Sequence, residues 1–499
     1  MTFLHTLCCV LSEASTRSSV VMGKTFAAVS HLGPIELREM SRVSLNYALM
    51  IMLGIPILTA CGSSSQQLHA QVPDSESPIT ITYALNESHS NSWVQQSAEG
   101  VVGIVYGAYV QGADRRADAG DLVYRTIQPD GSVNEDVVTT DRGVDKSVLL
   151  YDSNSRPRIF YASSDNSDQV IYYLYRGNAG GWLKEAVVNF ANQGGRYIYE
   201  LSADIGKDDA IHLLVLKSRS NPDSADFFDA YLDSHLYHVT NGSGSWITTL
   251  IHRYDTFYTY DMAVKTQRRQ DIAVDHNGYA HVVFGEQYKF DPATNPHAVG
   301  VLHYATNRSS SGWVREVALK SETTTDDAGW YPSLAVDRAG VPVVASTYVA
   351  RVPTHSLRYA QLCYSVRVGE GLWETTVVAD EGDGYYGTDG RQYTGALPHL
   401  ELDLDDTPHI VFSDVASSHN PQNVLSTGQI RYAVLRGSTW DVSTIYRQPS
   451  PQGFYQGLEM AGQCLVISSD GERIQVVGQE LNSTAENVYS CRLIHHVIR

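Results

Sequence analysis

Hydrophobic and polar residues alternate over short runs along most of this chain, and the runs come in pairs. In residues 271–284 and 333–344, two apolar runs are separated by a turn of the form Asp-x-x-Gly. Each run is short, and the Asp and Gly suit a tight connection between two antiparallel strands. A third apolar run follows the pair, as in 301–305 and 429–433, and a fourth follows as in 314–318. The pattern therefore predicts units of four antiparallel strands.

A tryptophan stands between the third and fourth strand of these units, at Trp182, Trp246, Trp313, Trp373 and Trp440. Four-stranded units that repeat every 60 residues or so are typical of the blades of a β-propeller. Hairpins of the same kind begin near Lys146, Tyr199, Asp271, Pro332, Pro398 and Gln463, and a less regular one covers 92–109. The sequence therefore predicts an all-β fold, a seven-bladed β-propeller.

The seventh unit ends one strand short. After the runs at 472–477 and 488–493 the chain has almost reached its end. Residues 78–83 have the alternation of a strand and precede the first complete unit. We expect them to complete the last blade, because an open blade would expose an unpaired strand edge. We therefore assign the propeller to residues 78–499.

The N-terminal region has the order of a targeting signal. Basic Arg42 precedes an apolar run at 47–57, and the sequence Leu-Thr-Ala-Cys then ends at Cys61. A small residue before a single cysteine at the end of such a run resembles a bacterial lipobox, in which the cysteine is lipidated after cleavage. An uncleaved membrane anchor is the alternative. Under the lipobox reading, translation starts at Met40.

This interpretation divides the chain into three parts. Residues 1–60 form the signal region, 61–77 form a polar, lipid-anchored tether, and 78–499 form the propeller. We expect a bacterial outer-membrane lipoprotein that is exposed on the cell surface, in the periplasm or secreted. Its contact with the membrane is expected through the lipid anchor alone, and we expect a monomer.

The composition narrows the class of partner. Loss of residues 1–60 removes four of the 36 basic and three of the 55 acidic side chains, which leaves 32 against 52 and a net charge of −20. So acidic a chain is not expected to bind nucleic acid. Beyond Cys61, three cysteines remain in the mature chain, so no disulfide framework is predicted. The sequence shows no metal motif of recognisable spacing and leaves a structural Ca²⁺ or Zn²⁺ open.

Long loops are expected on one face of the propeller. The loops between blades share a face with the loops between second and third strands, and the latter are long at 217–234, 286–300, 346–359 and 413–429. Loops carried by a rigid scaffold are where binding sites usually lie. These loops are rich in tyrosine, which offers flat surfaces to sugar rings, and in arginine, which binds carboxylate or sulfate. We therefore expect an anionic polysaccharide as the partner.

Several histidines recur at matching positions of the repeat, which indicates a role in the fold. They are His212, His281 and His409 at the start of second strands, with His238 and His303 expected to pack in third strands. His399 differs, because it directly precedes a predicted first strand. We expect its side chain to point into the mouth of the central channel.

The tyrosine-rich repeats, of the form Ser-Leu-Ala-Val-Asp-x-x-Gly-x-Pro at 333–342, together with the lipobox, resemble the propeller-type polysaccharide lyases of marine bacteria, above all ulvan lyases. The resemblance implies β-elimination at a uronic acid without a cofactor: a cation neutralises the carboxylate, a base removes the C5 proton, and a tyrosine protonates the leaving oxygen. Carried over to this chain, it makes His399 the base, Tyr331 the acid and Arg351 the neutralising cation.

The chain departs from this family in one respect. In those enzymes the histidine and tyrosine lie in early neighbouring blades, whereas no histidine accompanies Lys146 here, although Tyr199 and Lys217 fit a pair of tyrosine and cation. Three clusters therefore stay open as the site. The expected substrate-binding residues are His419, Tyr348, Arg196, Tyr199, His252, Arg253, Arg268 and Arg269, of which the last two alternatively form a solvated turn.

Two other functions stay open. A propeller glycoside hydrolase would need carboxylates at the channel, and Glu286, Asp414 and Glu480 stand at strand ends where they could serve. The Ser-x-Asp-x-Gly-x-Thr-Trp box of sialidases is absent from the sequence. A surface lipoprotein that binds a glycan without cleaving it would keep the aromatic face and tolerate the loss of His399 and Tyr331.

Overall fold

The structure is a computed structural model, and its described residues all lie in one compact unit, 71–499. The described residues are 79–82, 93–107, 121–140, 144–163, 170–177, 180–190, 196–219, 234–254, 270–287, 300–321, 327–351, 358–380, 390–418, 426–447, 464–467, 474–485 and 488–498. They form 28 β-strands and no helix. Within these ranges, no helical segment has the length and apolar character needed to cross a bilayer.

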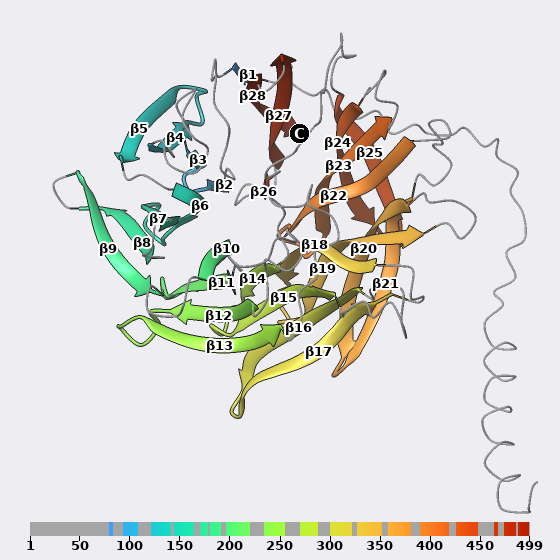
Figure 1. Ribbon diagram of the computed structural model, residues 1–499, viewed down its shortest axis with the longest axis horizontal. Helices are drawn as coiled ribbons and strands as arrows, with labels where there is room; N and C mark the ends of the chain where they lie inside the picture. Colours follow the sequence, from blue (N-terminus) through green and yellow to red (C-terminus); the bar gives the residue numbers. More distant parts are fainter. Residues whose placement is uncertain are drawn as a thin grey trace, which may run out of the picture. The chain divides into compact units, whose positions relative to one another are not determined.

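The strands form a seven-bladed propeller, as predicted (Figure 1). Blades 1 to 3 contain β2 (Trp93–Gln96), β3 (Val102–Gly107), β4 (Leu122–Ile127) and β5 (Val133–Thr139); β6 (Val144–Tyr151), β7 (Pro157–Ser163), β8 (Val170–Arg176) and β9 (Trp182–Asn189); and β10 (Arg196–Ile205), β11 (Ile211–Arg219), β12 (Ser234–Thr240) and β13 (Ile247–Tyr254). Blades 4 to 6 contain β14 (Gln270–Val274), β15 (Ala280–Gln287), β16 (Gly300–Ser309) and β17 (Gly312–Lys320); β18 (Asp327–Val336), β19 (Pro342–Arg351), β20 (Arg358–Gly369) and β21 (Leu372–Ala379); and β22 (Gly390–Leu402), β23 (Pro408–Ser418), β24 (Ser426–Arg436) and β25 (Thr439–Arg447).

Blade 7 joins the two ends of the described chain. It contains β26 (Cys464–Ile467), β27 (Ile474–Ala485), β28 (Val488–Ile498) and, as its outer strand, β1 (Ile79–Thr82). β1 pairs with β28 in antiparallel register, from Ile79 opposite His495 to Thr82 opposite Arg492. The prediction that an N-terminal strand completes the last blade is therefore confirmed. The pairing covers an edge of β28 that would otherwise be open.

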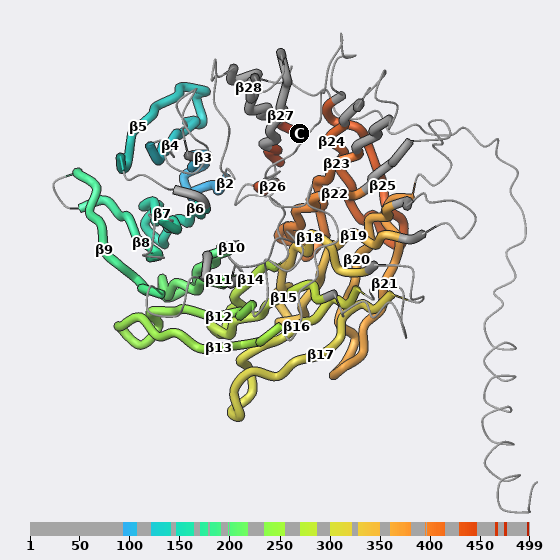
Figure 2. The backbone as a smooth tube through the Cα atoms, viewed as in Figure 1, coloured from blue at the N-terminus to red at the C-terminus, as the bar shows by residue number. Residues whose placement is uncertain are grey.

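The blades are arranged around a centre lined by their first strands (Figure 1). β6, β10, β14 and β18 lie towards the middle, whereas β9, β13, β17 and β21 lie on the outside. The smooth trace in Figure 2 shows that successive blades follow one another round the ring in chain order. Residues that share a level on the first strands therefore face one central channel.

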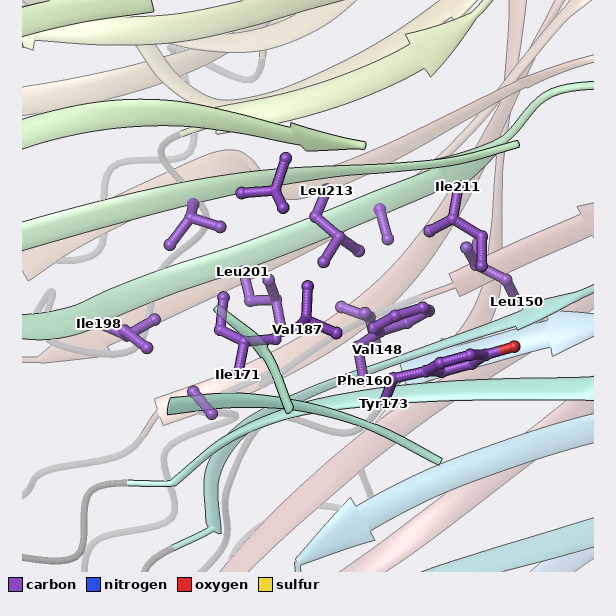
Figure 3. Close-up of a cluster of buried hydrophobic side chains, with 14 of the residues drawn as sticks. Val148, Leu150, Phe160, Ile171, Tyr173, Val187, Ile198, Leu201, Ile211 and Leu213 are labelled. Atoms are coloured by element: carbon purple, nitrogen blue, oxygen red, sulfur yellow. The ribbon is translucent and has the colours of Figure 1, made fainter. Parts of the chain in front are cut away.

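The hydrophobic cores lie between adjacent blades. The alternation of each strand gives it two faces, and both are buried in the middle strands because another blade packs on each side. Figure 3 shows one such core, in which Phe160 and Tyr173 of blade 2 lie beside Leu201 and Leu213 of blade 3. Phe160 and Leu213 are fully buried. Packing between blades, rather than within one, therefore stabilises the ring.

The repeated tryptophan has a structural role in this packing. Each one stands at the start of a fourth strand and meets an aromatic ring on the third strand of the preceding blade, edge to face. The pairs are Trp182 with Tyr124 (5.6 Å between centroids), Trp246 with Tyr173 (6.1 Å), Trp313 with His238 (5.2 Å), Trp373 with Tyr304 (5.2 Å) and Trp440 with Tyr364 (5.1 Å). Such contacts add about 0.5–1.5 kcal/mol each beyond the buried area.

The recurring histidines belong to the fold, as predicted. Nδ1 of His281 lies 2.6 Å from the hydroxyl of Tyr304, and its Nε2 lies 3.4 Å from Asp275 of the hairpin turn. His409 is bonded to Tyr432 and Asp403 in the same way. Although an aspartate, a histidine and a hydroxyl together resemble a catalytic triad, their repetition in buried positions marks them as packing elements.

Candidate functional site

His399, the base expected from the sequence, lies in β22 at the central channel. The strand begins at Gly390, so His399 stands inside it and not before it. Its Nδ1 atom accepts a hydrogen bond from the backbone N–H of Leu465 in blade 7, at 2.8 Å. Its Nε2 atom lies 3.9 Å from Oε1 of Glu401. Because the lone pair of Nδ1 is engaged, the neutral ring carries its proton on Nε2.

Tyr331, the expected acid, lies at a kink in β18. Its φ of 51° is in the left-handed region, its ring meets Trp330 at 5.8 Å, and only 7% of it is exposed. Gly329 just before it lies so close to blade 4 that a Cβ would stand 2.7 Å from Cβ of Leu302. The kink recurs in blade 6, where Leu397 also has a φ of 51°. The backbone at Tyr331 is therefore set by contact between neighbouring blades.

The other expected site residues are scattered. Tyr348 is half-buried near the end of β19, and Arg253 is exposed near the end of β13. The structure describes the backbone of Arg196 and Tyr199 in β10, Arg351 in β19 and Glu480 in β27, without their side chains. Cys61, Arg268, Arg269 and His419 lie outside the described residues, as do the signal region and the tether.

A cluster of charged and polar side chains crosses the seam between blades 3 and 4. Nη1 of Arg315 donates to Nδ1 of His252 at 2.8 Å, and Nε2 of His252 lies 3.4 Å from Oε1 of Glu286. The other oxygen of Glu286, Oε2, lies 2.8 Å from Nε2 of His303. The four residues come from β13, β15, β16 and β17. We call this set, Arg315, His252, Glu286 and His303, the seam cluster.

The contacts of the seam cluster fix where its protons lie. Arg315 can only donate, so Nδ1 of His252 is the acceptor and the ring proton stands on Nε2, towards Glu286. Burial alone would raise the pKa of Glu286, but its contacts with His252 and His303 outweigh that effect and lower the pKa to about 2. Glu286 is therefore a carboxylate at any working pH. It accepts a hydrogen bond from Nε2–H of His303.

His303 is consequently held as a base. Its Nε2–H donates to Glu286, which leaves the lone pair on Nδ1. That atom is buried and has no hydrogen-bond partner among the described residues, and the side chain is 3% exposed. A carboxylate that orients an imidazole and stabilises its protonated form is the arrangement seen in catalytic dyads and triads. The lone pair on Nδ1 of His303 is therefore oriented and unengaged, in a position closed to solvent.

The same strand position in blade 6 is occupied differently. Asp414 takes the place of Glu286, but it accepts a hydrogen bond from the backbone N–H of Gly395 at 3.3 Å and pairs with Arg431 at 2.9 Å. These bonds link the first, second and third strands of one blade. Asp414 is therefore a structural carboxylate, whereas Glu286 contacts imidazoles.

A second group of carboxylates lines the central channel. Asp204 in β10, Asp271 in β14 and Glu401 in β22 come from blades 3, 4 and 6. Burial raises the pKa of Glu401 to about 8, and the charges of Asp204 and Asp271 across the channel contribute. Burial also raises the pKa of Asp204 to about 7, although two backbone N–H groups donate to it. Asp204 and Glu401 are therefore able to hold a proton near neutral pH.

No group of three or more metal-binding side chains in suitable geometry occurs among the described residues.

Sequence reasoning found part of the seam cluster. His252 belonged to one expected cluster and Glu286 was noted as a strand-end carboxylate, but His303 was interpreted as packing and Arg315 was missed. Arg315 lies on the outer strand of one blade and His252 on that of another, so only blade packing brings them together. The signal in the sequence that could have revealed the cluster was a glutamate at 286 and a histidine at 303 on two strands expected to pair.

No family model matches this chain, and no curated protein matches it. Solved structures resemble it at low identity. They include a protein of unknown function from Dyadobacter fermentans (12% identity, TM-score 0.43, 86% of this chain and 100% of the other) and the polysaccharide lyase Uly1 (11%, 0.44, 82% and 90%). An α-L-arabinofuranosidase of Fusarium graminearum is also among them (11%, 0.41, 85% and 98%). Neighbours of this kind thus include a lyase and a glycoside hydrolase, and a shared fold does not choose between them.

Proposed function

We propose that this protein is a secreted, lipid-anchored polysaccharide lyase that cleaves a uronic-acid-containing, ulvan-like polysaccharide by β-elimination. The observation that supports the proposal best is the seam cluster. It combines an oriented imidazole base, His303, with an exposed guanidinium, Arg315, at one seam between blades. Base and cation are the two groups that proton removal beside a carboxylate requires.

The proposed reaction follows from these roles. Arg315 binds the uronate carboxylate, which makes the C5 proton more acidic by stabilising the developing negative charge. Nδ1 of His303 takes the C5 proton, and the electron pair forms the C4–C5 double bond as the C4–O bond breaks. The leaving oxygen receives a proton, for which Tyr331 in the next blade is the proposed donor. Glu286 stabilises the imidazolium that forms on His303.

The sequence-based set of His399, Tyr331 and Arg351 is a second placement of the same chemistry. There His399 would have to release the N–H of Leu465 before it could accept a substrate proton. Nδ1 of His303 has no such bond to break, and we therefore favour the seam cluster; because this atom is buried, substrate binding must open a path to it. In both placements the reaction needs no cofactor, and the expected monomer is sufficient.

The test uses the purified mature chain with a panel of uronic-acid polysaccharides, ulvan included. A rise in ultraviolet absorbance reports the unsaturated uronate that β-elimination creates. His303→Ala is expected to lower kcat by about 10²–10⁴, the usual contribution of a general base, while His399→Ala leaves most of it. If His399→Ala abolishes turnover and His303→Ala does not, the base is His399 and the seam-cluster assignment is wrong.

The channel carboxylates favour glycoside hydrolysis as a second candidate function. A hydrolase needs one carboxyl group that is protonated at working pH and another that is ionised. Glu401, with its raised pKa, and Asp271, which accepts four hydrogen bonds, fit these roles. New reducing ends without the absorbance change would establish this reaction. Retention on a polysaccharide column with neither product would indicate a glycan-binding protein.

A further inference from the structure

A ladder of hydrogen bonds ties the first strands of successive blades together. At one level of β14, β18 and β22, the side chain accepts a hydrogen bond from a backbone N–H of the next blade. Leu334 N–H donates to Asp271 at 2.9 Å, and Leu400 N–H donates to Ser333 at 3.0 Å. In the third step, Leu465 N–H donates to Nδ1 of His399 at 2.8 Å. Asp271, Ser333 and His399 are thus equivalent hydrogen-bond acceptors in blades 4, 5 and 6.

The three acceptors differ in how they respond to acid. The serine hydroxyl keeps its lone pairs at any pH, and the carboxylate of Asp271 is held by four donors that favour its ionised form. A protonated imidazole carries a hydrogen on both nitrogens and accepts nothing. Protonation of His399 would therefore place two N–H groups against each other. Of the three hydrogen bonds, the one between blades 6 and 7 is therefore the one that acid breaks.

We propose that His399 is an acid-sensitive latch on the seam between blade 6 and the closing blade, blade 7. Blade 7 holds both ends of the described propeller, since β1 pairs with β28 in it. Above the reference pKa of about 6.5 a histidine is mostly neutral, so the latch is closed there. Protonation of His399 in acid removes the Leu465 bond, and the edge of blade 7 beside the channel loosens.

Acidic side chains lie near His399. Oε1 of Glu401, on the same strand, lies 3.9 Å from Nε2 of His399. The burial of the site and the charges of Asp204 and Asp271 raise the pKa of Glu401, which weakens the counter-charge that it offers in acid. Asp204 and Asp271 face Glu401 from across the channel. On the blade 7 side, β26 presents the apolar Leu465 and contributes no charged residue.

The apolar core of this seam limits the effect. It joins Val411, Ile430 and Tyr432 of blade 6 to Leu465, Val476 and Ile498 of blade 7. These contacts do not depend on pH, so the loss of one hydrogen bond loosens β26 without unfolding the ring. The expected change is therefore local.

The experiment is backbone hydrogen exchange, read by mass spectrometry on peptides that cover 464–467, at pH 8 and pH 5 with correction for the intrinsic rates. In the wild type, protection is expected to fall about tenfold at pH 5, which corresponds to about 1.4 kcal/mol, near the upper end of what one hydrogen bond contributes. His399→Ser, which copies Ser333 of blade 5, is expected to show the same protection at both pH values.

A matched control removes another buried histidine, His281, which lies in blade 4. His281→Gln is expected to keep the wild-type pH dependence at 464–467. If His399→Ser loses protection at pH 5 as the wild type does, or if the wild type keeps it, the latch is refuted. These outcomes are independent of the proposed lyase activity, because they are measured without substrate.

Discussion

Glu286→Gln tests whether one carboxylate both holds the seam between blades 3 and 4 and orients the base. The contacts with His252 and His303 lower the pKa of Glu286 from its ordinary 4.5 to about 2. At about 1.4 kcal/mol per pKa unit, the folded state favours the charged form by roughly 3 kcal/mol. The side chain is buried, so solvent screens little of this contribution. Glutamine keeps the shape and removes the charge.

The sign of the pH dependence follows from the lowered pKa. The stabilisation is fully present above pH 4.5, where the unfolded state is ionised too, and is lost as the pH falls towards 2. We expect Glu286→Gln to be about 3 kcal/mol less stable than the wild type at pH 7, with the difference shrinking below pH 4.5. Urea unfolding at several pH values, on both proteins, measures it.

The same variant bears on catalysis. If Glu286 orients His303, Glu286→Gln should lower kcat by about 10²-fold or more with little change in KM. The reason is that the imidazole loses its orientation, whereas the substrate still binds. Asp414→Asn is the matched control, since it alters the carboxylate at the same strand position in blade 6 and should reduce stability without this loss of kcat. Equal stability of Glu286→Gln and the wild type at every pH would refute the assigned contacts.

Two further predictions concern the scaffold. His212 and His238 lie 3.0 Å apart, and burial lowers their pKa values to about 4 and about 3, so each contributes stability that is present above pH 6.5 and lost as the pH falls. Each histidine should account for roughly 2 kcal/mol of the unfolding free energy that is lost between pH 6.5 and 5. In urea unfolding, His238→Gln should therefore reduce the slope of unfolding free energy against pH. An unchanged slope would contradict the assignment. Ser155 has a φ of 57° at the turn position where blade 4 has Gly278. Ser155→Gly should raise the unfolding free energy by about 0.5–1 kcal/mol, whereas Asp209→Gly, which loses two bonds to Ser153, should not.

The fold was predictable from the sequence because its information is local and repeated. The alternation of each strand, the Asp-x-x-Gly turn and the tryptophan of each unit need only short stretches to be recognised. The turn at Asp275 illustrates this, since its carboxylate accepts the N–H groups of Asn277 and Tyr279 within the hairpin itself. Closure by 78–83 followed from counting strands. Repetition also indicated that His281 and His409 are packing residues, and their contacts in the structure agree, whereas His303 was interpreted as packing and is now the proposed base.

The candidate site depended on the tertiary structure. Arg315 and His252 are 63 residues apart, and each stands on the outer strand of a different blade, where no short pattern relates them. The environment of His399 is likewise set by an amide 66 residues away. The partners of a side chain decide whether it acts as a base, as a substrate-binding group or as a hydrogen-bond acceptor. In a propeller these partners come from the next blade, and the packing between blades decides which residues meet.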